Sequence, residues 1–127
     1  MTSLAFLAFW YTLSGVPAVL AHEATHALVA TLLGADVEAG AEDGRAYVDM
    51  VWPEETPSLA VVAAHLAPTV LGLGLLLLLL ALFGLPSPAS LSEAGIHQIA
   101  ILVLLATQWA VFVYPSREDR RPLRRLR

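Results

Sequence analysis

The sequence contains no cysteine and no lysine, and charged residues make up only 14% of its 127 positions. Without cysteine there are no disulfide bonds, thiolate metal sites or thiol nucleophiles, so any metal must be bound by histidine and carboxylate side chains. With 57% hydrophobic residues and a mean hydropathy of +0.70, the chain carries more apolar surface than a soluble domain of this length buries. The composition therefore predicts a membrane protein.

Three apolar stretches reach the ~20 residues needed to cross a hydrocarbon core; they lie at about residues 4–34, 58–84 and 95–114. They predict an all-α membrane protein in which three transmembrane helices form a single domain over residues 1–127. Ser14 to Pro17 interrupts the first stretch, so we expect a kink and then a second helical half from Val16 to Leu33 that ends at Gly34. In the second stretch, Gly72 and Gly74 predict close helix contact.

Residues 35–57 differ sharply from the apolar stretches around them. They contain seven acidic residues and a single basic one, Arg45, so this segment is expected outside the hydrocarbon. Apolar and polar residues alternate from Arg45 to Trp52 with the period of a half-buried strand. Asp43-Gly44 is a strong hairpin-turn signal. We therefore predict a small β-hairpin between the first and second spans, with strands at about 36–41 and 46–51.

The tail, residues 115–127, holds six of the seven basic residues, all of them arginine. A basic cluster just after a hydrophobic span is typical of a cytoplasmic anchor next to anionic lipid. The rest of the chain has no aromatic-rich basic surface, so nucleic acid is not an expected partner. Three crossings then predict a multi-pass protein of the cell membrane with its N-terminus outside. The hairpin and the C-terminus would be cytoplasmic, and the loop at 86–92 external.

The first apolar stretch contains the sequence His22-Glu23-Ala24-Thr25-His26, an HExxH pattern. On a helix, residues four apart lie on one face, so both imidazoles can bind one zinc ion. Glu23, beside the first histidine, can then act as general base on the bound water. Ionisable groups at membrane depth are costly and usually functional. Because apolar residues 27–33 continue for ~10 Å of helix past the motif, the pattern favours a zinc site within the membrane.

An HExxH motif in a first membrane helix, followed by a β-hairpin and two more spans, resembles the site-2 protease family of intramembrane zinc metalloproteases. His22, Glu23 and His26 match the zinc-binding pair and the catalytic glutamate of that family. Ala67-Pro68 resembles the small-residue-proline element of the family's middle core helix. The resemblance implies a Zn²⁺ cofactor and hydrolysis of peptide bonds in a membrane or membrane-proximal protein substrate.

The third zinc ligand is less directly indicated. Residues 115–119 resemble the Pro-Ser-x-x-Asp ending of small members of the family, which implies Asp119 as that ligand, but the more familiar Leu-Asp-Gly form is absent. Asp119 also lies beyond the third span, so the chain would have to fold back. His65 lies ~10 Å into the second span and competes for the position, unless it bonds the Ala64 carbonyl that Pro68 frees. Glu118 and a water molecule are the remaining alternatives.

Two classes of function follow from these residues. The first is a zinc metalloendopeptidase that holds an extended peptide along the strand edge at 46–51. The second is a non-catalytic membrane protein that binds a metal or another protein. Glu23 favours hydrolysis, because metal binding alone requires no carboxylate beside the first histidine. A transporter would have polar residues along all three spans, whereas here they cluster at one depth.

Overall fold

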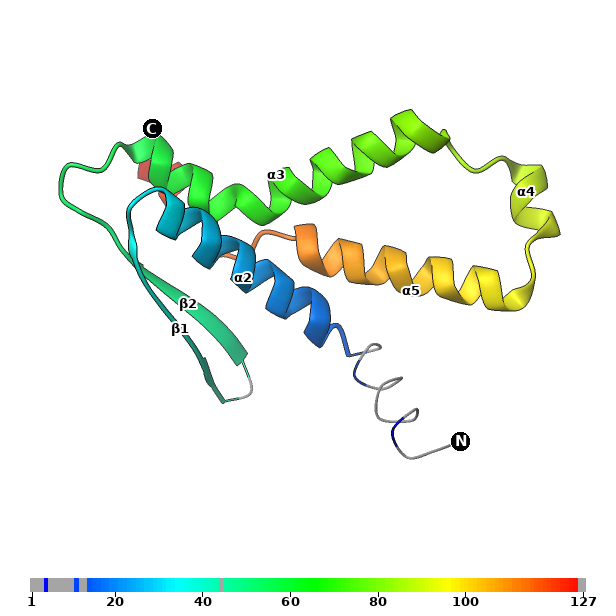
Figure 1. Cartoon of the computed structure of the whole chain (residues 1–127), viewed down its shortest axis with the longest axis horizontal. Coiled ribbons are helices and arrows are strands. Elements are labelled where there is room, and N and C mark those ends of the chain that lie inside the picture. The colour runs from blue at the N-terminus through cyan, green and yellow to red at the C-terminus, as the bar shows by residue number, and fades with distance from the viewer. Residues whose placement is uncertain (1–3, 5–10, 12–13, 44, 126–127) are drawn as a thin grey trace.

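The structure is a computed structural model that describes residues 4, 11, 14–43 and 45–125. Within this part of the chain the protein is mostly helical, with a two-stranded antiparallel hairpin after the first described helix (Figure 1). The elements in chain order are α2 (Val16–Leu32), β1 (Asp36–Glu42), β2 (Arg45–Val51), α3 (Ser58–Phe83), α4 (Pro88–Glu93), α5 (Ile96–Val113) and the 3₁₀ helix η1 (Pro122–Arg125).

Helix α2 begins and ends as the sequence predicts. Gly15 has a φ of 74° and precedes the helix, and Pro17 lies in the first turn, where a missing N–H costs nothing. At the other end Gly34 has a φ of 92°, and the Ala35 N–H donates to the Ala30 carbonyl over 2.9 Å. This is a Schellman ending, which glycine favours. Most of the N-terminal half of the predicted first span lies outside the described residues.

The hairpin is also confirmed, and each strand extends one residue further toward the turn than predicted. Its register runs from Asp36 opposite Val51 to Glu42 opposite Arg45. Asp43, in the turn, has a φ of 50°, a left-handed conformation that tight hairpin turns require. Both strands pack beside α2, so the hairpin is held against the helix that carries the HExxH motif.

One face of α2 forms the centre of the helix packing. Its buried residues, Ala18, His22, His26 and Ala30, recur every four positions and therefore lie along one side. Small alanines at the two ends of this face let neighbouring helices approach closely. Helix α2 packs against both α3 and α5. The two histidines consequently lie at the contact of three helices.

Helices α3 and α5 are joined by specific contacts near Gly72. An added Cβ at Gly72 would overlap the Val113 side chain, whereas one at Gly74 would meet no atom within 4 Å. The prediction of close contact is therefore correct for Gly72 and wrong for Gly74, which faces away from α5. Two side-chain hydrogen bonds join the same helices: Thr69 Oγ1 donates to the Val113 carbonyl over 2.8 Å, and Trp109 Nε1 donates to the Gly72 carbonyl over 3.0 Å.

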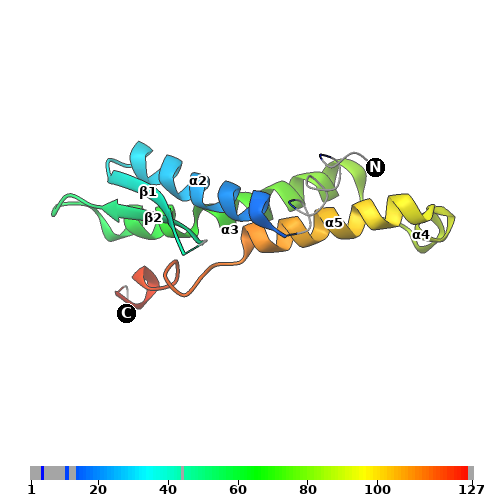
Figure 2. The same cartoon turned by 90° about the horizontal axis from the view of Figure 1, so that it is seen from below.

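By length and composition alone, α3 and α5 are long and apolar enough to cross a membrane. They are connected at one end through α4, a short helix in the region predicted to be only a loop. Ser87 caps α4 by accepting a hydrogen bond from the Ser90 N–H. Beyond the other end of α5 the chain continues in the direction of the helix, and η1 packs against α3 (Figure 2). The tail thus stays in contact with the helix bundle.

Replacing Gly72 with alanine should lower the free energy of unfolding by about 1–3 kcal/mol, because the new methyl group must push α5 away from α3. Thermal unfolding of the detergent-solubilised protein, followed by circular dichroism, measures the change. Gly74→Ala is the matched control and should leave stability unchanged or raise it by about 0.5–1 kcal/mol, since alanine is the better helix former. Equal effects of the two substitutions would contradict this helix contact.

Candidate metal centre

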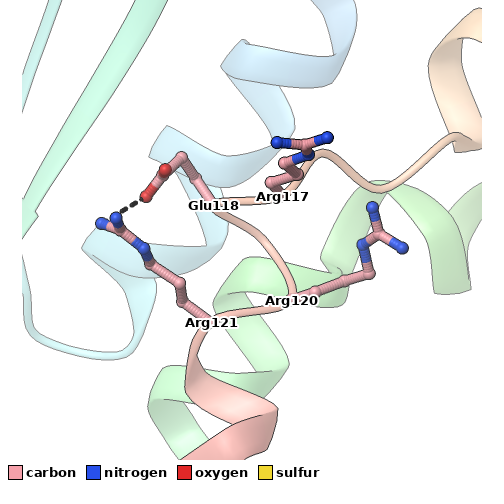
Figure 3. A pocket seen from close by; sticks show the side chains of 4 residues that line it. All are labelled: Arg117, Glu118, Arg120 and Arg121. Carbon is pink, nitrogen blue, oxygen red and sulfur yellow. Dashed lines mark ion pairs between the residues drawn. The ribbon is translucent and has the colours of Figure 1, made fainter.

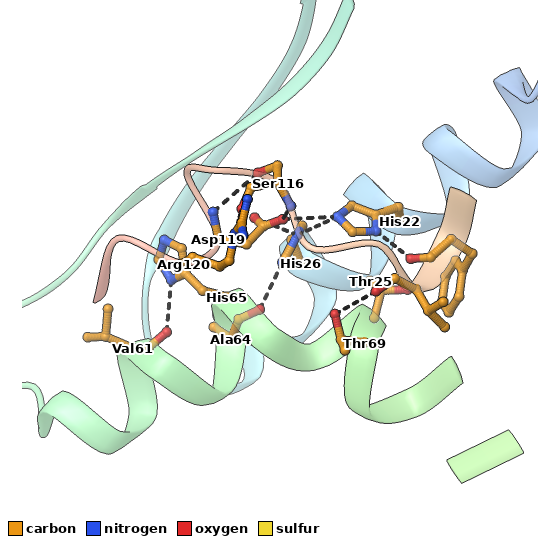
Figure 4. A network of polar contacts seen from close by, with 12 residues as sticks. His22, Thr25, His26, Val61, Ala64, His65, Thr69, Ser116, Asp119 and Arg120 are labelled. Carbon is orange, nitrogen blue, oxygen red and sulfur yellow. Dashed lines mark hydrogen bonds and ion pairs between the residues drawn. The ribbon is translucent and has the colours of Figure 1, made fainter. Parts of the chain in front are cut away.

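Three buried side chains from distant parts of the chain meet at one point (Figure 4). His22 Nε2 lies 3.0 Å from His26 Nε2, His26 Nε2 lies 3.1 Å from Asp119 Oδ1, and His22 Nε2 lies 3.4 Å from Asp119 Oδ2. Ligand atoms on one tetrahedral zinc ion are about 3.3 Å apart, because Zn–N and Zn–O bonds measure ~2.0–2.2 Å. The group therefore has both the composition and the spacing to hold a metal ion.

The outer nitrogen of each histidine is held by a backbone carbonyl. His22 Nδ1 lies 2.6 Å from the Phe112 carbonyl oxygen in α5, and His26 Nδ1 lies 2.8 Å from the Ala64 carbonyl oxygen in α3. A carbonyl oxygen only accepts hydrogen bonds, so Nδ1 must be the protonated nitrogen in both rings. In the neutral rings Nε2 then carries a free lone pair, as a metal ligand requires.

As a result, three hydrogen-bond acceptors face one another in the buried group. Two Nε2 lone pairs and a carboxylate face one another over 3.0 to 3.4 Å, in a place where His26 is only 2% exposed and Asp119 only 6%. Such groups repel one another, and more strongly where water is excluded, unless a cation lies among them. A single proton bridges two of these atoms, whereas a metal ion bonds all three. The geometry thus fits a metal better than a proton.

Asp119 is positioned by the turn that follows Pro115. The Ser116 N–H donates to Asp119 Oδ2 over 2.7 Å, and the Asp119 N–H donates back to Ser116 Oγ over 3.2 Å. Burial alone would raise the pKa of the Asp119 carboxyl, but in the metal-free protein hydrogen bonds from Ser116, and from the Nε2 atoms of His22 and His26 when these rings are protonated, outweigh burial and hold this pKa well below its usual range. Asp119 is therefore ionised at neutral pH, as a metal ligand must be.

The two rival ligands lie elsewhere. His65 Nδ1 bonds the Val61 carbonyl of its own helix over 2.8 Å, and its ring centre is 6.4 Å from that of His26. Glu118 is exposed and forms an ion pair with Arg121 over 2.7 Å, on the outer side of the turn (Figure 3). Neither belongs to the buried group. The expectation that His65 bonds the freed Ala64 carbonyl is wrong, because His26 bonds it instead.

A cleft of about 810 Å³ opens beside the buried group. One wall is strand β2 from Arg45 to Met50, and the other walls include Glu23 and His26 of α2, His65 of α3, and Asp119. Glu23 therefore faces the same space as two of the three candidate ligands.

No family model, no curated protein and no solved structure matches this chain. The resemblance drawn from the sequence depends on the HExxH pattern, the Pro-Ser-x-x-Asp ending and the order of the predicted elements.

Sequence reasoning missed the groups that orient the ligands. The reciprocal bonds of Ser116 had a visible signal, since serine three residues before aspartate is a common local hydrogen-bonding pair. The contact between His22 and the Phe112 carbonyl had none, because the two residues are 90 positions apart. Only the packing of α5 against α2 brings them together.

We expect Asp119→Ala to weaken metal binding by orders of magnitude, because it leaves two protein ligands for the metal. His65→Ala, the matched control, should retain the metal of the wild-type protein. Metal content after purification, measured by inductively coupled plasma mass spectrometry, tests both. The reverse outcome would make His65 the ligand. Stoichiometric zinc in a His26→Ala variant would reject the site altogether.

Proposed function

We propose that this protein is a membrane-embedded zinc metalloprotease that cleaves a peptide bond in a membrane or membrane-proximal protein. The observation that carries the proposal is the buried convergence of His22, His26 and Asp119, with Glu23 facing the adjoining cleft. The likeness of the HExxH motif and of the 115–119 segment to the site-2 protease family supports the same reaction.

The donor set favours zinc. Two imidazole nitrogens and one carboxylate oxygen are typical ligands of catalytic zinc, which keeps a fourth position open for water or substrate. A structural zinc site would have four protein ligands, and in the described part of the chain no fourth histidine or acidic residue joins the group. Three ligands beside an open cleft are the arrangement that hydrolysis requires.

When bound, zinc would lower the pKa of a water molecule toward ~7. Glu23 is the one carboxylate adjacent in sequence to a histidine of the site, and it faces the cleft that this water must enter. Its carboxylate would accept the proton of the water as the oxygen attacks the peptide carbonyl. The same carboxyl group would then donate the proton to the leaving amine, so that Glu23 returns to its starting state.

Strand β2 supports a way to hold the substrate. It pairs with β1 along one edge, and in the described part of the chain no strand pairs with its other edge. The β2 residues line the cleft. An extended peptide that adds to this edge by main-chain hydrogen bonds would present a carbonyl group to the metal, whatever its side chains.

The surfaces of α3 and α5 support a location within the bilayer. Large apolar side chains project outward along both helices, among them Leu77, Leu82 and Ile101, each more than half exposed. A contiguous apolar surface of this length is unfavourable in water but suited to lipid. Together with the first apolar stretch, this supports three spans, with the arginine-rich tail and the hairpin on the cytoplasmic side.

Glu23→Gln should retain zinc and the fold but reduce proteolysis by about 10²–10⁴-fold, because an amide cannot accept the proton of the water. The test compares the membrane proteomes of cells that express wild type or variant, searching for fragments that depend on Glu23. Glu38→Gln, on the exposed side of β1, is the control and should cleave normally. Fragments of equal abundance with Glu23→Gln would exclude Glu23 as the base. No fragments with wild type would favour the non-catalytic alternative.

Reporter fusions should place the C-terminus and the hairpin turn in the cytoplasm and the N-terminus outside. The physical reason is that basic residues next to a span are retained on the cytoplasmic side, and six arginines follow the third span. A reporter that is active only inside the cell, fused after residue 127 or inserted at residue 43, measures this. If both fusions are inactive, and the same fusions to a reporter that works only outside the cell are active, the topology is inverted.

A further inference from the structure

Helix α3 contains an internal proline, Pro68, which is completely buried. In a regular helix the N–H of residue 68 would bond the carbonyl of residue 64. Proline has no N–H, so the Ala64 carbonyl loses its helical donor. The structure shows what takes the place of that donor: His26 Nδ1, which approaches the Ala64 oxygen from α2 over 2.8 Å (Figure 4).

Proline also affects the direction of this carbonyl. A carbonyl oxygen has two lone pairs, so a missing helical bond would not by itself bring a second helix into contact. The ring of an internal proline crowds the carbonyl four residues earlier and bends the helix, and α3 is visibly bent (Figure 1). A carbonyl tilted off the helix axis can meet a donor on the neighbouring helix. Pro68 therefore affects the Ala64 carbonyl in two ways: it removes the helical N–H donor, and it changes the direction in which the carbonyl oxygen points.

His22 is likewise held by a backbone carbonyl that lacks its helical donor, but this carbonyl belongs to α5. Its Nδ1 bonds the Phe112 carbonyl, near the end of α5. The helical partner of that carbonyl would be the Ser116 N–H, but this N–H bonds the Asp119 carboxylate instead. Each histidine of the site thus uses a carbonyl that has lost its own helical donor, one through a proline and one through the turn that carries the third ligand.

We propose that Pro68 is a positioning residue of the metal centre: it reserves the Ala64 carbonyl for His26 Nδ1–H and so keeps His26 Nε2 directed at the metal. The inference rests on the metal site of the proposed function, and it adds a residue outside the ligand set to that site. Second-sphere partners of this kind fix the ring tautomer and orientation of a ligating histidine. Pro68 acts only through His26 and touches neither metal nor substrate.

Pro68→Ala restores an N–H that competes for the Ala64 carbonyl, and it should weaken zinc binding by about 10- to 100-fold. Pro68→Val restores the same N–H without removing side-chain volume, so that a cavity does not explain the result. Affinity is measured by competition with a chelator, using the full chain in detergent micelles. Val62→Ala is the control, because it removes a similar volume from the buried face of α3 at a position that already has its N–H.

A second measurement separates positioning from general damage. In the zinc-loaded wild type, ¹⁵N NMR of labelled histidines should show His26 protonated and hydrogen-bonded at Nδ1 and zinc-bound at Nε2. In both Pro68 variants the Nδ1–H signal should shift or exchange faster with water, while that of His22 remains. Val62→Ala should leave both signals in place.

The outcomes distinguish this inference from the proposed function. If both Pro68 variants lose no more zinc affinity than Val62→Ala and keep the His26 Nδ1–H signal, the inference is wrong and the zinc site stands. If wild-type protein binds no zinc, the proposed function fails and the inference fails with it. If the Pro68 variants bind zinc more weakly and wild type cleaves nothing, the positioning role holds for a metal-binding protein that is not a protease.

Discussion

The architecture depends on one electrostatic constraint: three hydrogen-bond acceptors, His22 Nε2, His26 Nε2 and a carboxylate oxygen of Asp119, face one another in a buried place. This arrangement is unfavourable unless a cation occupies the space between them. Every neighbouring feature serves to hold it. The face of α2 places the two rings one turn apart, α3 and α5 hold their outer nitrogens, and the turn after α5 supplies the negative charge.

Carbonyl–histidine hydrogen bonds join the three helices around small side chains in the described part of the chain. The buried residues around the site are small, with Ala30 and Ala64 fully enclosed, so the helix backbones approach closely enough for carbonyls to reach the histidines. Small residues and interhelical hydrogen bonds are the usual basis of helix association where lipid removes the hydrophobic driving force. The candidate metal site and the helix packing thus share the same contacts, so a change in either is expected to alter the other.

A site built in this way leaves one side open. The backbone of α3 and α5 and the C-terminal turn enclose the candidate ligands, but toward β2 a cleft opens beside them. Glu23 faces that open side because it is one residue, and so about 100° of helix, away from His22. The HExxH spacing therefore places the two candidate ligands on the buried face and a carboxylate at its margin, beside the cleft.

The sequence alone determined the local features: the HExxH face of α2, the glycine ending at Gly34 and the hairpin around Asp43. Each depends on residues a few positions apart, where helix and turn geometry fix the outcome. It did not determine that Gly72 contacts α5 while Gly74 does not, that α4 forms, or that the Ala64 carbonyl binds His26 instead of His65. These three features depend on which faces of distant helices meet. Asp119 lies between the two cases, because its motif was visible in the sequence but its place in the fold was not. The expectation that the chain folds back is wrong: α5 ends beside the motif, with the Phe112 carbonyl 2.6 Å from His22 Nδ1, so the turn that follows meets the histidines directly. Contact between residues nearly a hundred positions apart is set by helix packing and not by local backbone geometry.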